Sequence, residues 1–413
     1  MSALQLGHEV AIYTTHHDSR HCFAETTGDG MLAPLVHAHG DWLPRQLLGR
    51  CTAACATVRM AFLAIHVAIR ERRRAHVFIC DGVSAPVPVL RLTNLPVLFY
   101  CHFPDKLLCV ERSNIVKRLY RLPLDLCEEV FTGMSSTIAV NSRYTAGIFA
   151  QAFPLLRRLG WRPRVLYPPI DLNGFAARPA EARPRLGPIV SINRFERKKN
   201  VVLAVDALAI VRGRCSAELF STVQLVIAGG YDPRVRENIQ YKEELMARVA
   251  ELSLGDNVQF RPNLSNAERS QLLREASCVL YTPDREHFGI VPLEAMYAGA
   301  PVVAVASGGP LETVLDGETG FLCQQTPEDF ACAVLKFVRD PSLTLSMGAH
   351  GRAHVSKKFS LEAFGAAFQA LLLETVDLHA VSSSRYIAPL VIAAALLALA
   401  FAVVPAVLSR LLR

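Results

Sequence analysis

Glu286-His-Phe-Gly-Ile-Val-Pro-Leu-Glu294 places two carboxylates eight positions apart, on either side of a glycine turn. Pro is typical of the first position of a helix and Gly of the position after its end, so we expect a short helix over 293–298 with Glu294 in its first turn. Its N-terminus would carry free N–H groups and about half a positive charge, which suit a phosphate. The carboxylates can accept hydrogen bonds from sugar hydroxyls. The alternative is that the two glutamates are simply solvent-exposed charges at the end of a helix.

The regions around this stretch predict two α/β domains. Apolar runs alternate with helical patterns, which is typical of parallel, doubly wound sheets. A proline-rich stretch over 167–188 has the composition of a linker. Before it, the expected strands cover 8–15, 76–80, 97–101 and 137–141, with 127–132 as a further element and Ser142 as a helix cap. After it, we expect strands at 189–192, 223–230, 258–260, 278–281 and 301–305, with helices at 201–212 and 241–252.

Composition bounds the function classes. A length of 413 residues fits two domains of ordinary size. The net charge of +7 arises from 44 basic and 37 acidic residues, a mild bias that suits anionic ligands or an anionic membrane and does not indicate nucleic-acid binding. The 11 cysteines contain no C-x-x-C pair, which favours a reduced environment and gives no support for a metal site.

Two groups of polar residues follow predicted strands. Arg194 and Lys199 follow the strand at 189–192, and two cations five positions apart can grip a diphosphate. A solvated basic loop is the alternative, because Arg197 and Lys198 lie between them. His102 and Asp105 come just after the strand at 97–101. Ligands of open α/β sheets lie beyond the carboxyl ends of strands, so His102 is a better candidate for a functional role than an ordinary core histidine.

The stretch from Glu286 to Glu294 resembles the E-x7-E motif of the retaining glycosyltransferases of the GT4 family, which have the GT-B fold. The runs at 99–105, 191–200, 280–283 and 286–298 are similar to the alpha-1,3/1,6-mannosyltransferases of asparagine-linked glycan assembly within that family. The resemblance implies that Glu286 and His102 are catalytic. It also implies donor-binding roles for Arg194, Lys199, Phe288, Gly289, Ile290 and Glu294, with Glu294 on the nucleotide ribose and Glu286 on the hexose. Gly308-Gly309 is expected in a loop near the donor.

The resemblance also implies the architecture and the reaction. Two Rossmann-like domains would face a cleft, an acceptor domain at 1–170 and a nucleotide-sugar domain at 171–358, followed by a crossover helix at 359–380. The enzyme would move mannose from GDP-mannose, with retention and without a required metal, to a dolichol-diphosphate-linked oligosaccharide. It would make an α1,3 and then an α1,6 linkage on the cytosolic face of the endoplasmic reticulum. Other transferases of glycan assembly are candidate partners.

Two segments bear on membrane association. The stretch 387–408 has no charge over 22 residues, enough to span a hydrocarbon core of ~30 Å, so 386–409 is predicted to be a transmembrane anchor. The second segment is the apolar run at 60–69, which precedes Arg70, Arg72, Arg73 and Arg74. It is either a buried helix with a charged end or a helix lying in the plane of a membrane, and the apolar run is too short to span.

The N-terminal residues 1–7 do not have the pattern of a signal peptide. In the family, the strand at 8–15 would be the second of its domain, so a first strand, its glycine turn and most of the first helix are expected upstream of this chain. One alternative is therefore a catalytically impaired, truncated variant acting as a membrane-bound scaffold. A glycogen-type synthase or phosphorylase is a third class, which the predicted anchor disfavours.

Overall fold

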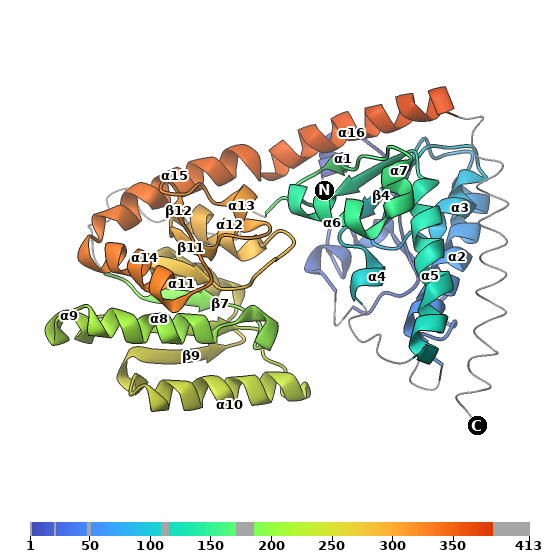
Figure 1. Cartoon of the computed structure of the whole chain (residues 1–413). Coiled ribbons are helices and arrows are strands. Elements are labelled where there is room, and N and C mark those ends of the chain that lie inside the picture. Colours follow the sequence, from blue (N-terminus) through green and yellow to red (C-terminus); the bar gives the residue numbers. More distant parts are fainter. Residues whose placement is uncertain (1, 20–21, 48–50, 109–114, 171–185, 383–413) are drawn as a thin grey trace. The chain divides into compact units, whose positions relative to one another are not determined.

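The computed structural model describes residues 2–19, 22–47, 51–108, 115–170 and 186–382. The chain divides into two compact units (Figure 1). Unit 1 comprises Met1–Tyr167 and Gly365–Arg413, and unit 2 comprises Pro168–Phe364. Both are built on parallel sheets, so the predicted α/β class with a parallel sheet in each unit is confirmed.

Unit 1 contains two separate parallel sheets. The larger has the order β3 (Phe78–Asp81), β4 (Val97–Cys101), β5 (Thr137–Val140) and β6 (Arg164–Val165). The smaller pairs β1 (Ile12–Thr14) with β2 (Val36–Ala38). The strand at 97–101 lies as predicted, whereas the one expected at 8–15 is only three residues long.

The helices of unit 1 pack around these sheets. They are α1 (Ser2–Gln5), α2 (Thr52–Glu71), α3 (Pro86–Arg91), α4 (Asp105–Leu108), α5 (Ile115–Gly133), α6 (Arg143–Ala152) and α7 (Pro154–Arg158), with 3-10 turns η1 (Ala24–Thr26) and η2 (Ala33–Leu35). The segment 127–132 is part of α5 and not an element of its own. Ser142 caps α6 as predicted, because its hydroxyl accepts a hydrogen bond from the Thr145 N–H at 2.9 Å.

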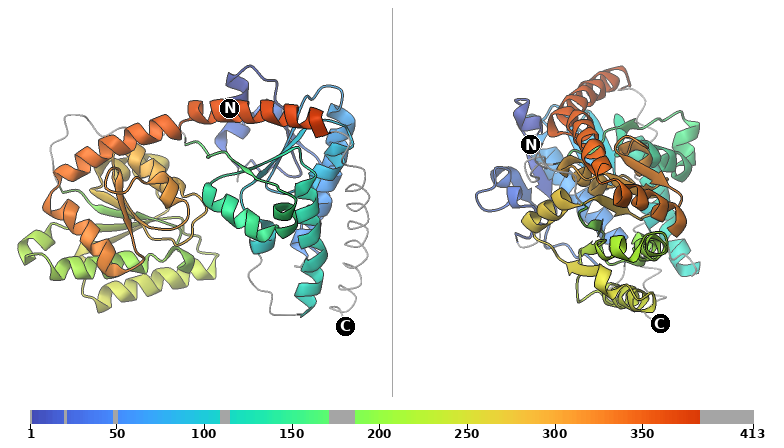
Figure 2. Two further views of the ribbon diagram at one scale, coloured as in Figure 1. Left: turned by 45° about the horizontal axis from the view of Figure 1, so that its top comes forward. Right: turned by 90° about the vertical axis from the view of Figure 1, so that its left-hand side faces the viewer.

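Unit 2 is a six-stranded parallel sheet with helices on both faces (Figure 2). The strand order is β12-β11-β10-β7-β8-β9. The strands are β7 (Ile189–Ile192), β8 (Leu225–Gly229), β9 (Val258–Pro262), β10 (Cys278–Tyr281), β11 (Val302–Val305) and β12 (Gly320–Cys323). The chain winds outward from β7 to β9 and then, in the other direction, from β10 to β12. The neighbours β7 and β10 are therefore the point at which the strand order reverses.

The helices of unit 2 form two layers. One face carries α8 (Val202–Gly213), α10 (Arg236–Glu251) and α14 (Pro327–Arg339), and the other carries α11 (Asn266–Glu275), α12 (Ile290–Ala298) and α15 (Ser342–Lys358). Shorter elements are α9 (Ala217–Ser221), α13 (Pro310–Thr313), η3 (Arg197–Lys199) and η4 (Gly255–Asn257).

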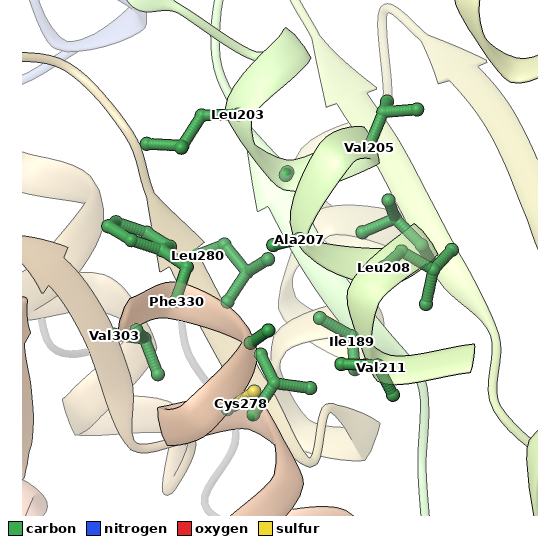
Figure 3. Close-up of a cluster of buried hydrophobic side chains, with 14 of the residues drawn as sticks. Ile189, Leu203, Val205, Ala207, Leu208, Val211, Cys278, Leu280, Val303 and Phe330 are labelled. Atoms are coloured by element: carbon green, nitrogen blue, oxygen red, sulfur yellow. The ribbon is translucent and has the colours of Figure 1, made fainter. Parts of the chain in front are cut away.

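The first layer of unit 2 encloses the main hydrophobic core. In Figure 3, side chains of α8, α14 and the central strands gather between the sheet and the helices. Ile189, Leu208, Cys278, Val303 and Phe330 are each at most 3% exposed. The burial of both faces explains why these strands read as continuous apolar runs.

The long helix α16 (Leu361–Ser382) begins in unit 2 and continues in unit 1. In unit 1 its Gln369 hydrogen-bonds His8, and its Glu374 pairs with Arg164. Near its end, the His379 ring lies 3.0 Å from the Asn94 carbonyl and 2.5 Å from Arg91. These contacts hold the last part of α16 against unit 1.

Two stretches, Thr52–Glu71 and Ser342–Ala380, are long and apolar enough to cross a membrane by length and composition alone, which is weak evidence. The apolar run at 60–69, which is too short to span by itself, lies within the 20-residue helix α2. α2 nevertheless packs into unit 1, where buried Arg59 donates a hydrogen bond to the Thr15 carbonyl at 3.0 Å. The predicted anchor at 386–409 lies outside the described residues.

Candidate functional site

Three of the residues that the sequence singled out follow the two strands of unit 2 at which the strand order reverses. Arg194 and Lys199 follow β7, and Glu286 follows β10, the strand hydrogen-bonded to β7. Ligands of open α/β sheets bind outside the carboxyl ends of strands at such a reversal point. The topology therefore brings together side chains that are 87 residues apart in the sequence.

Lys199 and Glu286 form a charge-assisted hydrogen bond between the ammonium Nζ and the carboxylate Oε2. Both side chains are mostly buried, at 13% and 23% exposure. The Lys199 backbone is fixed as well, because the Thr282 hydroxyl donates to its carbonyl at 2.7 Å. Burial alone would raise the pKa of Glu286, but the hydrogen bond and the charge of Lys199 hold that pKa below its ordinary value. Glu286 is therefore a carboxylate at neutral pH.

Arg194 differs from Lys199 in its surroundings. Its guanidinium is 62% exposed and lies 3.0 Å from the Glu196 carboxylate, which also pairs with Lys198 at 3.2 Å. Because its partner is on the same loop, Arg194 can turn toward an anionic ligand at little cost. The sequence analysis did not predict Glu196 at the site. Its position two residues after Arg194 is the only feature of the sequence that indicates this ion pair.

The helix after Glu286 begins earlier than predicted. Gly289 has a φ of +84° and acts as the N-cap, so α12 starts at Ile290 and Pro292 is its third residue. Pro is tolerated there because the first four N–H groups of a helix have no intrahelical partner. Glu294 is thus the fifth helical residue, and its expected place in the first turn is wrong.

The three residues Phe288, Gly289 and Ile290 between the two glutamates differ in exposure and in what they contact. The Phe288 ring is 4% exposed and packs at 5.9 Å from the Phe359 ring, so it contributes to the core. Ile290 is exposed, and its N–H is at the free start of α12. Gly289 lies against Tyr281, since a Cβ there would be 3.1 Å from the tyrosine hydroxyl.

Glu294 is a second buried carboxylate with a cationic partner. It pairs with Arg269 of α11, and its side chain is 11% exposed. Burial raises the pKa of Glu294, and the charge of Arg269 offsets only part of that rise. Arg269 was missed at the sequence level, because it lies 25 residues before Glu294 and approaches it only through the packing of α11 on α12.

The backbone of Gly308 and Gly309 packs against the loop that contains Glu286. The Gly309 N–H donates to the Glu286 carbonyl at 2.8 Å. A Cβ on Gly308, where φ is +62°, would lie 2.3 Å from the same carbonyl, and one on Gly309 would lie 2.1 Å from the Phe288 carbonyl. The two backbones therefore approach more closely than any side chain allows.

We expect Gly308→Ala to lower the free energy of unfolding of unit 2 by roughly 2–3 kcal/mol, through the clash and the strained φ together. The matched control is Gly317→Ala, which has a φ of +76° but nothing within 4 Å of the added Cβ. Gly317→Ala should lower the free energy of unfolding by only about 1 kcal/mol. Calorimetric unfolding of the three proteins checks this, and equal losses in both variants would contradict the close approach.

His102 lies in unit 1, just past the end of β4. Its Nε2 is 2.7 Å from a carboxylate oxygen of Asp81, the last residue of the neighbouring strand β3. The hydrogen bond that His102 donates to the Asp81 carboxylate raises the pKa of His102. Asp105, the other polar residue just after β4, pairs with Arg121 at 3.0 Å. Asp81 could have been found from the register, because β3 and β4 are parallel neighbours that end at one edge.

Comparison with known proteins assigns the chain to a family. Residues 181–354 match the family model described as "Glycosyl transferases group 1". The human protein named alpha-1,3/1,6-mannosyltransferase ALG2 is 47% identical over 368 residues, which cover 87% of this chain and 86% of the relative. The chain belongs to the alpha-1,3/1,6-mannosyltransferase family. The family members from Rhizomucor pusillus and Saccharomyces cerevisiae are 43% and 36% identical, over 89% and 88% of this chain and 85% and 78% of their own lengths.

Solved structures support the fold of this mannosyltransferase. A glycosyltransferase from Rickettsia africae covers 91% of the chain and 92% of its own length, with a TM-score of 0.63 at 15% identity. The sucrose-phosphate synthase of Thermosynechococcus elongatus covers 82% of both chains, with a TM-score of 0.58 at 21% identity. The chain therefore has a GT-B-like fold with two α/β units built on parallel sheets.

Proposed function

We propose that this family member transfers mannose from GDP-mannose, with retention of configuration, to a dolichol-diphosphate-linked oligosaccharide and makes α1,3 and α1,6 linkages. The observation that carries the proposal is the Lys199–Glu286 pair beyond the adjacent ends of β7 and β10. A mostly buried cation and a carboxylate held side by side suit a substrate that presents a diphosphate next to a sugar. A nucleotide-sugar donor and a glycan acceptor follow from the family.

Different residues of unit 2 would bind the diphosphate and the ribose of the donor. Lys199 and Arg194 would hold the diphosphate and stabilise the charge that develops on it as the sugar leaves. The N–H groups at the start of α12, which include that of Ile290 after the Gly289 turn, would contact a phosphate oxygen. Glu294 would accept hydrogen bonds from the ribose hydroxyls, and its ion pair with Arg269 would hold the carboxylate in place.

Glu286 and His102 are the residues proposed to act on the reacting sugar. Glu286 would accept hydrogen bonds from mannose hydroxyls, an arrangement that is strongest as positive charge grows on the ring. His102, protonated more readily because of Asp81, would act from unit 1 on the sugar or on the leaving phosphate. No step in this scheme is assigned to a metal.

The lipid-linked acceptor places the reaction at a membrane. We infer that 386–409 anchors the chain in the endoplasmic reticulum membrane, with both units on the cytosolic face. A non-catalytic scaffold of the same membrane is the second candidate function.

One transfer assay separates the two functions. The full chain in detergent is incubated with a mannosyl-chitobiose acceptor on a dolichol-type lipid and with radiolabelled GDP-mannose, GDP-glucose or UDP-glucose in turn. We expect label to enter the lipid product only from GDP-mannose, and specific mannosidases to release it from α1,3 and α1,6 linkages. No transfer from any donor, by protein that still binds membranes, would favour the scaffold.

A further inference from the structure

Glu128 of α5 is bonded to two segments of unit 1, one after β3 and one after β4. Helices α4 and α5 pack against each other (Figure 1). The two carboxylate oxygens of Glu128 each accept a backbone hydrogen bond at the start of α4, from the N–H of Asp105 at 2.6 Å and from that of Lys106 at 2.9 Å. The backbone carbonyl of Glu128 accepts a hydrogen bond from the Ser84 hydroxyl at 3.3 Å. Ser84 lies three residues after Asp81, so Glu128 joins the segments that follow both members of the Asp81–His102 pair.

The loop between β4 and α4 has only three residues, the first of which is His102. Asn141, a buried residue just after β5, fixes the start of this loop, because its side-chain amide donates to the His102 carbonyl at 3.1 Å. Glu128 fixes its end, because the first N–H groups of a helix have no partner within the helix and here use this carboxylate. Since both ends of so short a loop are held, the direction of the His102 side chain depends on these two contacts.

The pair formed by His102 and Asp81 needs such support. Its side chains are 54% and 70% exposed, and an exposed ion pair does little to hold its own geometry. A group that acts on a substrate has to be held within about 0.5 Å of its working position by the residues that support it. Glu128 provides that support through the backbone at the end of the loop.

The hydrogen bonds to Glu128 depend on its ionisation. The titratable groups around it belong to α4, to its own helix and to β4, and are Asp105, Lys106, Arg121, Glu129 and Cys101. Burial raises the pKa of Glu128 to about 7, although the two N–H groups and the charge of Lys106 lower it. A protonated carboxyl carries one O–H and no longer offers two free acceptor oxygens. The contact between Glu128 and the loop is therefore complete above about pH 7 and weakens below it.

We propose that Glu128 is a positioning residue for His102: its carboxylate fixes the start of α4 and thereby the loop that presents the His102 side chain to the substrate. The inference rests on the proposed function for the role of His102, whereas the fixing of the loop does not require catalysis. Glu129 is the matched control, since its carboxylate accepts hydrogen bonds from the N–H groups of Leu155 and Leu156 at the start of another helix, α7.

Hydrogen exchange followed by mass spectrometry tests the contact without catalysis. The full chain in detergent is exchanged as the parent, as Glu128→Gln and as Glu129→Gln. In Glu128→Gln we expect the peptide from β4 to α4 to lose protection by at least about fivefold at Asp105 and Lys106, because a carboxamide has one acceptor oxygen in place of two. In Glu129→Gln the peptide that loses protection should be the one containing α7. Unchanged protection of the β4–α4 peptide in Glu128→Gln would overturn the proposal.

The pH dependence of kcat tests the consequence for His102. It is measured with saturating GDP-mannose and lipid-linked acceptor, so that weaker donor binding does not contribute. The ratio of kcat in the parent to kcat in Glu128→Gln should rise from about twofold at about pH 6 to about tenfold at about pH 8, because only the parent gains a carboxylate over this range. The titration of His102 is common to both proteins and cancels in the ratio.

The same ratio for Glu129→Gln should not change with pH. A merely structural role of Glu128 would lower the stability or the yield of Glu128→Gln and leave its ratio constant, so a ratio independent of pH would contradict the proposal. If the parent transferred no mannose, the proposed function would fail, and the exchange experiment alone would decide whether Glu128 fixes the loop.

Discussion

Lys199→Met is expected to lower kcat/KM for GDP-mannose by roughly 10²–10³-fold, because it removes a cation proposed to contact the diphosphate as charge develops there. The same change leaves the mostly buried Glu286 carboxylate without its ionic partner, which is costly by itself. Initial rates over a range of GDP-mannose concentrations, with saturating lipid-linked acceptor, measure the effect. Both kcat and the affinity for the donor should decrease.

Lys198→Met is the matched control, since it removes the same charge one position earlier. Lys198 is 66% exposed and pairs with Glu196 at the surface, where an ion pair contributes little. Its kcat/KM should stay within about twofold of the parent. A similar loss in both variants would indicate a general electrostatic effect of the loop and contradict the specific role of Lys199.

Glu286→Gln is expected to reduce kcat by roughly 10²-fold or more while changing the donor KM little, because its carboxylate is proposed to act most strongly on the transition state. Glu294→Gln should show the opposite pattern, with a donor KM about tenfold higher from weakened hydrogen bonds to the ribose and a smaller change in kcat. The two variants are controls for each other, since each neutralises one carboxylate that has a cationic partner.

Steady-state kinetics of both variants, together with calorimetric binding of GDP, would separate the two roles. GDP contains the ribose and the diphosphate but no hexose, so its affinity should fall in Glu294→Gln and hold in Glu286→Gln. The assignment would be wrong if Glu286→Gln bound GDP poorly and turned over normally. Unfolding curves of both proteins guard against a simple loss of structure.

The sequence predicts the strands best where burial is complete. Apolar runs at β4, β7 and β10 are bounded by polar or glycine turns and have the predicted limits, because both faces of these strands are covered. β1 is shorter than its apolar pattern, because only the three residues that pair with β2 form a ladder. The start of α12 was misplaced because Pro292 was read as the first helical residue, whereas the left-handed Gly289 sets the boundary.

Among the site residues, those in local motifs could be predicted, and those that approach through tertiary packing could not. Lys199 and Glu286 were chosen from their own loops, and their contact depends on β7 and β10 being neighbours in the sheet. Partners supplied by tertiary packing could not be read from a local pattern. Arg269 reaches Glu294 from another helix, and Asp81 reaches His102 from another strand. Both partners shift the pKa of a residue that was predicted without them.

Photoaffinity labelling with an azido analogue of GDP-mannose tests the central claim most directly, namely that the donor binds beyond the adjacent ends of β7 and β10 in unit 2. The labelled full chain is digested, and the modified peptides are identified by mass spectrometry with and without excess GDP-mannose. We predict that competed label lies in the peptides containing Arg194–Lys199 and Glu286–Glu294. Competed label confined to the loops after β8 and β9, or to unit 1, would contradict the account.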